Sequence, residues 1–359
     1  MADSKQAPLD AEAAAKAAFA SVQDQPFPND IFTAPELRWA VIGCGVIANQ
    51  MAQSLALAGR KLAGVANRTL SKAQAFAEQY GVEKVYETVE DLYADPDIDA
   101  VYITTPHNTH ITYLRAALAA GKHVLCEKAI TLNSAELDEA RAIADEHNVV
   151  LMDATTVLHM PLYQELRRRM DAGDFGRMNL AQLNFGSYKE YGDLTNRFYN
   201  RNLAGGAMLD IGVYALSIMR LFMASQPVEV VSLGNTCETG VDVAGGIVCR
   251  NADQQLGVVS LTLHSKQPKR SVISFDKCYI EVNEYPRADH ATIVWTADGH
   301  REEVHAGTEA YALCYEMADL EKAVAGDDSK CELLGYASDV MELMTKLRAD
   351  WGVVYPEEE

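Results

Sequence analysis

The sequence predicts a two-domain protein in which a doubly wound α/β domain with a parallel sheet precedes an α+β domain with an open, mainly antiparallel sheet. Between residues 37 and 153, short apolar runs alternate with amphipathic segments, which is typical of buried parallel strands joined by helices. From Val228 onward, apolar and polar residues alternate instead, which indicates antiparallel strands with one solvated face. A chain of 359 residues is long enough for two domains.

Five apolar runs predict the strands of the first domain, residues 37–153. None of the runs alternates with polar residues, as expected for strands that helices cover on both faces. They occupy residues 39–42, 62–66, 100–103, 123–126 and 149–152. The amphipathic segments between them predict helices over residues 47–58, 71–80, 111–120 and 134–147.

The second domain is expected to cover residues 154–359. Helical periodicity predicts a helix over residues 157–172, another after Gly205 and Gly206, and two more over 309–325 and 336–351. Residues 1–36 form an N-terminal extension that is rich in alanine and then interrupted by prolines. This extension fits either a mobile tail or an arm that wraps a neighbouring subunit or a cofactor.

The composition excludes several function classes. With 31 Lys and Arg against 51 Asp and Glu, the net charge of −20 repels nucleic acids and anionic lipid, so neither nucleic acid nor membrane is expected as a partner. The most apolar stretch, residues 206–225, contains Asp210 and Arg220 and is not expected to span a bilayer. Seven scattered cysteines without a C-x-x-C pair indicate neither disulfides nor a metal site. With no export signal visible, a cytoplasmic protein is expected.

A glycine motif directly follows the first predicted strand. Residues 43–48 read Gly-Cys-Gly-Val-Ile-Ala and lead into a helix, which is the context of a dinucleotide-binding fingerprint. The glycines allow a tight turn and a close approach of the backbone to a pyrophosphate; a purely structural turn is the alternative. We therefore expect Gly43, Gly45, Val46 and Ile47 to bind a dinucleotide.

The end of the second predicted strand bears on the choice of dinucleotide. An enzyme selective for NAD usually carries Asp or Glu here, and this chain has Asn67 and Arg68. The missing carboxylate removes repulsion of a 2′-phosphate, and the guanidinium of Arg68 can pair with that phosphate. NADP is therefore favoured, although Asn67 can also bind the free ribose hydroxyl of NAD and Arg68 fits an ordinary surface charge.

Residues suited to proton transfer stand at two further places. Glu127 and Lys128 follow the strand predicted over residues 123–126, at the edge where open α/β sheets bind ligands. Asp210 and Tyr214 are four residues apart on a helix whose other face is apolar, so their side chains are expected to project together. Alone, such residues fit a surface lysine and a structural contact, but beside a nicotinamide they are candidates for proton transfer.

These motifs together resemble the Gfo/Idh/MocA oxidoreductases, the family of glucose-fructose oxidoreductase and inositol dehydrogenase. The resemblance rests on residues 43–48, Thr-Pro-His-Asn-Thr-His at 105–110, Glu127 and Lys128, and Gly205 and Gly206 with Asp210 and Tyr214. It implies an N-terminal Rossmann domain, a C-terminal domain whose open sheet serves oligomer contacts, and action on sugars, polyols, glycosides or related diols. It also implies catalytic positions at Lys128, Asp210 and Tyr214, and a nicotinamide site lined by Thr105, Pro106, Asn108, His110 and Glu127.

Two positions depart from the family pattern. Ala129 stands where the family usually has proline, which leaves the cis geometry at this point open. Leu158 and His159 stand where many members have arginine and an aromatic residue. His159 remains a candidate for substrate contact, with a core histidine as the alternative, and so do Arg197 and Asn200, with an ordinary surface loop as the alternative.

The sequence thus predicts an NAD(P)-dependent oxidoreductase that transfers hydride to or from a secondary hydroxyl of a sugar, polyol or glycoside. Tyr214 is expected to take the hydroxyl proton while Lys128 favours its phenolate and Asp210 orients the hydroxyl; whether Lys128 or Tyr214 is the formal base stays open. Because of the net charge of −20, a neutral polyhydroxylated substrate is the easier partner.

Two other functions fit the same motifs. One is an enzyme with tightly bound NAD that transiently oxidises a glycoside, by 3-oxidation or by oxidation and elimination. The other is a non-catalytic NAD(P) sensor, which would not need Lys128, Asp210 and Tyr214. In each case the resemblance implies a homo-oligomer, from a dimer to a tetramer or higher, formed through the C-terminal sheet.

Overall fold

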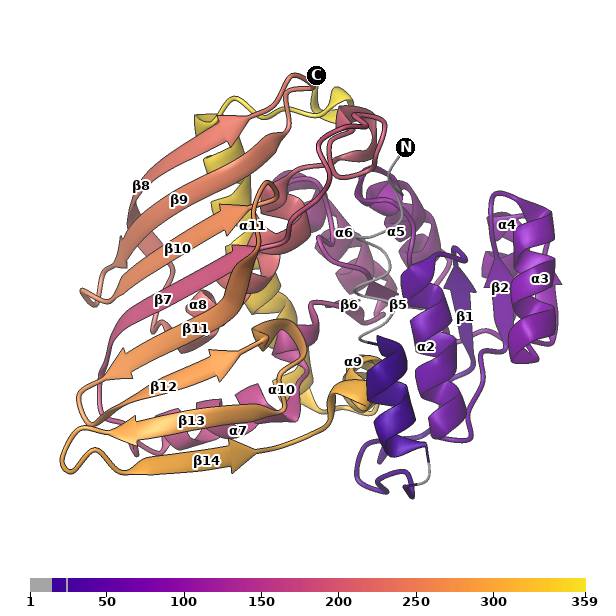
Figure 1. Ribbon diagram of the computed structural model, residues 1–359. Coiled ribbons are helices and arrows are strands. Elements are labelled where there is room, and N and C mark those ends of the chain that lie inside the picture. Colours follow the sequence, from indigo (N-terminus) through magenta and orange to yellow (C-terminus); the bar gives the residue numbers. More distant parts are fainter. Residues whose placement is uncertain (1–14, 24) are drawn as a thin grey trace.

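The computed structural model describes residues 15–23 and 25–359 and contains two separate sheets (Figure 1). The first sheet is parallel throughout and has the order β3-β2-β1-β4-β5-β6. Its strands are β1 (Trp39–Ile42), β2 (Gly64–Ala66), β3 (Lys84–Tyr86), β4 (Ala100–Ile103), β5 (His123–Cys126) and β6 (Leu151–Asp153). The strand order reverses between β1 and β4, and ligands of open α/β sheets bind at the carboxyl ends of the strands at such a point.

Helices cover both faces of this sheet. The helices within the same stretch of chain are α2 (Val46–Leu57), α3 (Leu70–Tyr80), α4 (Val89–Ala94), α5 (His110–Ala119) and α6 (Ser134–His147). Ala40 and Ile42 of β1 pack in one apolar cluster with α5 and α6, whereas Val41 packs in another with α2 and α3. This second cluster also contains Leu313 and Met317 of α9 (Ala312–Val324), so a helix from late in the chain completes the cover of the first sheet.

The second sheet has eight strands in the order β14-β13-β12-β11-β7-β10-β9-β8. All neighbouring strands are antiparallel except β7 and β10. The strands are β7 (Met178–Gly186), β8 (Pro227–Thr236), β9 (Asp242–Asn251), β10 (Leu256–Thr262), β11 (Gln267–Phe275), β12 (Cys278–Asn283), β13 (His290–Trp295) and β14 (Arg301–His305). The predicted fold class, a Rossmann domain followed by an open and mainly antiparallel sheet, is confirmed.

The remaining helices pack on one side of the second sheet or link the two sheets (Figure 1). They are α7 (Pro161–Asp171), a π-helical turn (Met208–Gly212), α8 (Val213–Phe222), α10 (Asp328–Cys331) and α11 (Leu333–Asp350). Short 3₁₀ turns lie at His107–Thr109, Thr156–Leu158, Arg201–Leu203, Tyr285–Arg287, Glu309–Tyr311 and Pro356–Glu358. The prediction of a helix over residues 157–172 is wrong for its first turn. A 3₁₀ turn ends before Pro161, because proline disfavours α-helical geometry at the preceding residue and opens α7 instead.

The N-terminal extension packs against the rest of the chain in its described part. Residues 15–22 are helical, and Ala15 and Val22 are buried. The ring of Phe27 lies 4.9 Å from that of Tyr311, and the guanidinium of Arg60 lies 4.0 Å from the centroid of Phe32. The prediction of a mobile tail is therefore wrong for residues 15–23 and 25–36. Residues 1–14 and 24 of the predicted extension lie outside the described residues.

The outer face of the second sheet is apolar near β8. Val231 of β8 pairs in register with Val248 of β9, so both side chains share a face, and they are 75% and 48% exposed. Leu233, two residues further along β8, is on the same face and is 81% exposed. On the inner face Trp351 packs against Gly234 and Gly245, where a Cβ atom would lie within 2.4 Å of its ring.

One helical segment has the length and composition of a membrane span. This segment, Arg201–Phe222, has a mean hydropathy of 1.3, and 83% of its most apolar window is buried inside the protein. It includes the π-helical turn and α8, whose residues pack in the main apolar cluster. Burial of this kind is typical of a core helix, in agreement with the expectation from Asp210 and Arg220.

Candidate functional site

The glycine loop leaves space at the N-terminus of α2. Gly43 has a φ of 104°, and a Cβ atom there would lie 2.6 Å from the hydroxyl oxygen of Thr104, so this position requires glycine. Gly45 precedes the helix with an ordinary φ of −78°, and nothing lies within 4 Å of where its Cβ would be. The first turn of α2 has no acidic residue and no side-chain cap. Its free N–H groups and the open space fit the pyrophosphate of a dinucleotide.

The end of β2 presents polar groups without a carboxylate. The amide of Asn67 donates to the carbonyl oxygen of Thr69 at 2.9 Å, which holds the turn into α3. Arg68 is exposed. Thr105 and Pro106 follow β4, on the other side of β1, and the hydroxyl of Thr109 donates to that of Thr105 at 2.9 Å. The residues expected to hold the two ends of a dinucleotide therefore stand at the carboxyl edge of one sheet.

Lys128 is the centre of the second group of residues. Its ammonium donates to the backbone oxygen of Asp210 at 2.6 Å and lies 3.3 Å from the carboxylate of the same residue. It also lies 4.8 Å from the centroid of the Tyr214 ring. The guanidinium of Arg197 reaches the same carboxylate oxygen at 3.3 Å. Residues from the end of β5, the π-helical turn, α8 and a loop thus meet around one ammonium group.

Burial and charge set the protonation of this group. Burial lowers the pKa of Lys128, but Tyr214 and Asp210 outweigh this effect and the pKa is raised. Lys128 lowers the pKa of Tyr214, as expected from the sequence, but burial raises this pKa by more, so the phenol is protonated at neutral pH. Burial opposes ionisation of Asp210, yet Lys128 and Arg197 hold its pKa well below the usual range. At neutral pH the site contains an ammonium, a carboxylate and a neutral phenol.

The helix that carries Asp210 is not a regular α-helix. Between Met208 and Gly212 it forms a π-helical turn, in which the N–H of Val213 donates to the oxygen of Met208. The turn begins where the N–H of Met208 donates to the buried carboxylate of Asp242 at 2.6 Å. π-Helical turns are rare in proteins, and those that occur often lie at functional sites. Here the wide turn presents the backbone oxygen and the carboxylate of Asp210 to Lys128 together.

Two histidines fix the loop around Lys128. The Nε2 atom of His107 lies 3.0 Å from the backbone oxygen of Lys128, and burial lowers the pKa of this histidine to about 3, so the ring is neutral. His110 is fully buried between the oxygens of Thr105, at 2.8 Å, and Ala129, at 3.0 Å. The expected nicotinamide contact of His110 is therefore wrong, because both ring nitrogens already face backbone oxygens. The Lys128–Ala129 peptide bond is cis although alanine replaces proline.

Glu127, the residue before Lys128, influences a second glutamate, Glu316. The hydroxyl of Tyr102 donates to Glu127, whose pKa is raised by burial. Glu316 of α9 is fully buried, and neither of its carboxylate oxygens has a hydrogen-bond partner among the described residues. Burial, and then the charge of Glu127, raise the pKa of Glu316 well above its usual range. Glu316 was not predicted, because nothing in its own segment distinguishes it from a surface glutamate on a helix.

The C-terminal tail holds the loop before the π-helical turn. A Cβ atom on Gly205 would lie 2.6 Å from the backbone oxygen of Arg197, so the chain requires glycine there. The hydroxyl of Tyr355 donates to the oxygen of Gly205 at 2.7 Å. The amide of Asn108 donates to Glu357 at 2.7 Å and to the oxygen of Asn202 at 3.2 Å. Asn108 therefore joins the tail to this loop, and its place beside the nicotinamide stays a prediction.

Two predicted substrate contacts are also placed elsewhere. His159 is 1% exposed, with Nδ1 3.1 Å from Asp319 and Nε2 2.8 Å from the oxygen of Asp153. Substrate contact by His159 is therefore wrong, and the core histidine is the correct alternative. The side chain of Asn200 accepts from the N–H of Asn202 at 3.0 Å and caps a 3₁₀ turn. Of the three candidates, Arg197 alone reaches the residues around Lys128.

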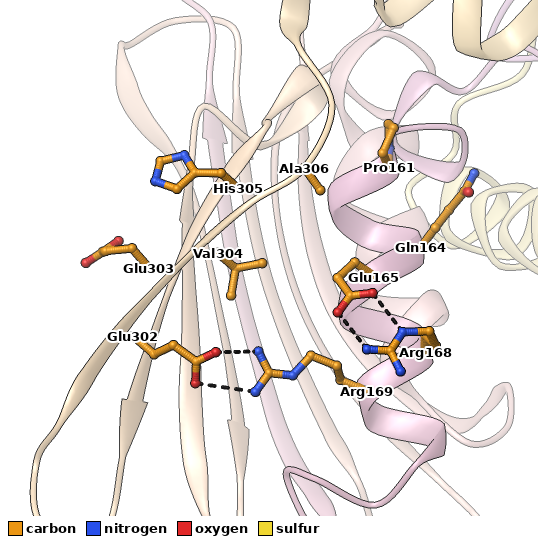
Figure 2. A pocket seen from close by; sticks show the side chains of 10 residues that line it. All are labelled: Pro161, Gln164, Glu165, Arg168, Arg169, Glu302, Glu303, Val304, His305 and Ala306. Atoms are coloured by element: carbon orange, nitrogen blue, oxygen red, sulfur yellow. Dashed lines mark hydrogen bonds and ion pairs between the residues drawn. The ribbon is translucent and has the colours of Figure 1, made fainter. Parts of the chain in front are cut away.

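A surface groove of about 690 Å³ lies elsewhere, between α7 and β14 (Figure 2). Figure 2 shows Arg169 of α7 paired with Glu302 of β14, at 2.6 Å, and Arg168 paired with Glu165 within α7, at 2.8 Å. None of the lining residues belongs to the group around Lys128. The groove is lined by mutually neutralised ion pairs, and we assign it no chemical role.

Comparison with known proteins gives matches along most of the chain. A model of an oxidoreductase family with an NAD-binding Rossmann fold matches residues 37–155, and a GFO/IDH/MocA C-terminal domain model matches residues 163–281. The chain is 32% identical to mouse (Mus musculus) trans-1,2-dihydrobenzene-1,2-diol dehydrogenase over 254 residues, which are 69% of this chain and 75% of the mouse protein.

Two solved structures have a similar fold. One is KijD10, a 3-ketoreductase from Actinomadura kijaniata in complex with NADP and TDP-benzene, with a TM-score of 0.75, 25% identity and coverage of 88% of this chain and 98% of that chain. The other is a levoglucosan dehydrogenase in complex with NADH and levoglucosan, with a TM-score of 0.75, 19% identity and coverage of 87% and 97%. The chain therefore belongs to the Gfo/Idh/MocA family and is an oxidoreductase with an NAD(P)-binding Rossmann domain.

Proposed function

We propose that the protein transfers hydride between NAD(P) and the carbon of a secondary hydroxyl on a sugar, polyol or glycoside. The observation that carries this proposal is the position of the Lys128 ammonium, 3.3 Å from the carboxylate of Asp210 and 4.8 Å from the centroid of Tyr214, directly after β5. The diol substrate in the name of the mouse relative and the levoglucosan bound to a structural neighbour support a hydroxylated substrate.

The glycine loop is proposed to bind the dinucleotide through its pyrophosphate. Gly43 allows the turn, and Gly45, Val46 and Ile47 offer backbone N–H groups at the start of α2. The absence of Asp and Glu at Asn67 and Arg68 supports NADP over NAD. Thr105, Pro106 and Glu127 stand at the strand ends where the nicotinamide ring and its ribose would lie.

The bound nicotinamide would accept or donate the hydride, and the residues around Lys128 are proposed to handle the proton. In oxidation, a hydride leaves the substrate carbon for the nicotinamide, the proton of the hydroxyl on that carbon passes to the phenolate form of Tyr214, and a C=O bond forms. The ammonium of Lys128 stabilises negative charge on the substrate oxygen, and Asp210 holds this ammonium in place. The neutral phenol of Tyr214 is suited to protonate that oxygen in the reverse reaction, the reduction of a ketone.

The experiment that tests the proposal measures hydride transfer directly. The purified protein is mixed with NADP or NAD and a panel of sugars, polyols and glycosides, and the nicotinamide absorbance is followed. We expect stoichiometric change in free dinucleotide with at least one class of hydroxylated substrate. Product formation without net change in free dinucleotide would favour the alternative enzyme with tightly bound NAD. Failure to bind either dinucleotide, measured by native mass spectrometry, would contradict the proposal.

The assembly and location of the protein are part of the same proposal. The exposed Val231, Leu233 and Val248 on the outer face of the second sheet support a homo-oligomer formed through that face. All seven cysteines are free, which supports a reducing cytoplasmic environment. Native mass spectrometry gives the subunit number, and a monomer at micromolar concentration would contradict the oligomer.

A further inference from the structure

Positive charge gathers around Asp210 in a chain whose net charge is −20. Lys128 and Arg197 each lie 3.3 Å from its carboxylate, and Lys189 acts on it from further away. One carboxylate thus faces three cationic side chains. The other carboxylate that raises the pKa of Lys128 is that of Glu127, and Arg287 also acts on Glu127. Around Asp210 and Glu127, two carboxylates therefore balance four cationic side chains, and positive charge remains.

Lys189 is the least neutralised of these cations. Its side chain is half-buried, and its ammonium lies 4.2 Å from the centroid of the Phe198 ring. No carboxylate of residues 15–23 and 25–359 forms an ion pair with it, whereas the neighbouring Lys269 pairs with Glu284 at 2.8 Å. Burial lowers the pKa of Lys189; the more distant carboxylate of Asp210 opposes this effect, and repulsion from Arg197 and Lys128 adds to it. A half-buried ammonium without an anion in direct contact is costly unless a ligand supplies one.

Lys189 and Arg197 contact the same aromatic ring, that of Phe198. The guanidinium of Arg197 lies 4.1 Å from the same Phe198 ring that Lys189 contacts. The backbone of Lys189 is fixed on both sides, since its N–H donates to the oxygen of Leu263 at 2.7 Å and its oxygen accepts from Tyr199 at 2.9 Å. Tyr199 itself is fully buried. The core therefore positions the backbone of Lys189, and the Phe198 ring and the carboxylate of Asp210 contact the more exposed side chain of Arg197.

We propose that Lys189 and Arg197 bind an anionic group of the substrate, a carboxylate or a phosphate, so that the enzyme prefers sugar acids or phosphorylated sugars to neutral polyols. The inference rests on the proposed hydride transfer and names the substrate class for that site. Ammonium and guanidinium groups donate charge-assisted hydrogen bonds to both kinds of anion, and partial burial strengthens the attraction. This proposal differs from the expectation of a neutral substrate, which was based on the net charge. The reason is that the local charge around Asp210 is opposite in sign to the charge of the whole chain.

Steady-state kinetics with matched substrates tests the inference. Each neutral sugar of the panel is compared with its uronic acid, which adds a carboxylate, and with its monophosphate. We expect kcat/KM to be about tenfold or more higher for one anionic member than for the neutral member. Lys189→Gln should lower that preference about tenfold, mainly through KM, and Lys189→Arg, which keeps the charge, should retain it. Lys346→Gln, the same change at an exposed lysine of α11, should alter neither substrate.

Binding decides the inference independently of turnover. The melting temperature of the protein saturated with NADP is measured with glucuronate, glucose 6-phosphate and glucose, for the wild type and for Lys189→Gln. We expect at least one anion to raise the melting temperature of the wild type more than glucose does, and this difference to shrink in Lys189→Gln. The carboxylate and phosphate arms show which anion is bound.

Two outcomes would overturn the inference while leaving the proposed function intact. One is efficient hydride transfer on neutral sugars together with weaker use of every matched acid and phosphate. The other is an anion preference that Lys189→Gln and Lys346→Gln leave equally unchanged. Loss of dinucleotide binding, in contrast, would contradict the proposed function itself, so the two failures are distinguishable.

Discussion

The two ends of the candidate site are built on different plans. At the start of α2, Gly45 has nothing within 4 Å of its missing side chain, and no acidic residue occupies the first turn of the helix. Around Lys128, in contrast, the ammonium already contacts both the backbone and the carboxylate of Asp210 and the ring of Tyr214. The cofactor end consists of backbone and open space, and the chemical end consists of side chains that hold one another. Function at the first should fail when atoms are added, and at the second when atoms are removed.

The largest effect is expected from Lys128→Met, which keeps the length of the side chain and removes its charge. Turnover should fall roughly 10²–10⁴-fold, because the substrate oxygen loses its cationic partner and Asp210 loses one of its two ion pairs. Turnover is measured with the best substrate of the panel. Dinucleotide affinity, measured by fluorescence titration, should stay close to that of the wild type. Near wild-type turnover would remove Lys128 from the mechanism.

Tyr214→Phe keeps the ring beside Lys128 and removes only the hydroxyl. Turnover should fall roughly 10²-fold, the lower limit expected for loss of a general acid or base. Burial raises the pKa of Tyr214, so in the wild type oxidation should accelerate as the pH rises into the alkaline range, while ketone reduction should slow. The variant should lose this alkaline dependence in both directions. An unchanged pH profile would assign the proton step to another group.

The glycine loop offers a matched pair of substitutions. Gly45→Val fits the backbone and the space of the protein alone, so its free energy of unfolding should change by less than about 0.5 kcal/mol while dinucleotide affinity falls about tenfold or more. Gly43→Ala should instead cost about 1–3 kcal/mol of stability, because φ is 104° and the new Cβ meets Thr104. Urea unfolding and dinucleotide titration measure both quantities. Equal stability of the two variants would show that the loop is less rigid than its geometry implies.

The smallest expected effect concerns the choice of dinucleotide. Arg68→Ala should lower the preference for NADP over NAD about tenfold, since one charge-assisted hydrogen bond to the 2′-phosphate is lost. The KM values for NADP and NAD give the ratio directly. Lys61→Ala, at another exposed residue near the same strand, serves as the control and should leave the ratio unchanged. If Arg68→Ala changes the two KM values equally, Arg68 does not read the 2′-phosphate.

Local patterns were sufficient to predict much of the first domain. The predicted strands at residues 39–42, 100–103 and 123–126 coincide with β1, β4 and β5, because uninterrupted apolar runs mark strands buried on both faces. β3 was missed because Lys84–Tyr86 is only three residues long and is half-buried at the sheet edge. The π-helical turn at Met208–Gly212 was missed because the apolar periodicity of its sequence is that of an ordinary helix.

The sequence predicted which residues form the candidate site better than it predicted their contacts. Lys128, Asp210 and Tyr214 come together as the motifs suggested, although their roles stay predictions. The partners of His159 and Asn108 were not foreseen, because these partners, Asp319 and Glu357, lie 160 and 249 residues away along the chain. Such long-range pairs leave no trace in local spacing. The same limit hid Lys189, whose meaning depends on Arg197 and Phe198 packing beside it.

The contacts of the last residues have a practical consequence for how the protein is handled. Tyr355 holds the oxygen of Gly205, and Glu357 holds Asn108 in the loop that follows β4. A purification tag fused at this end would therefore begin within a few residues of the two loops that frame the reacting groups. Kinetic constants from a C-terminally tagged preparation and from an untagged one should be compared before either is assigned to the enzyme.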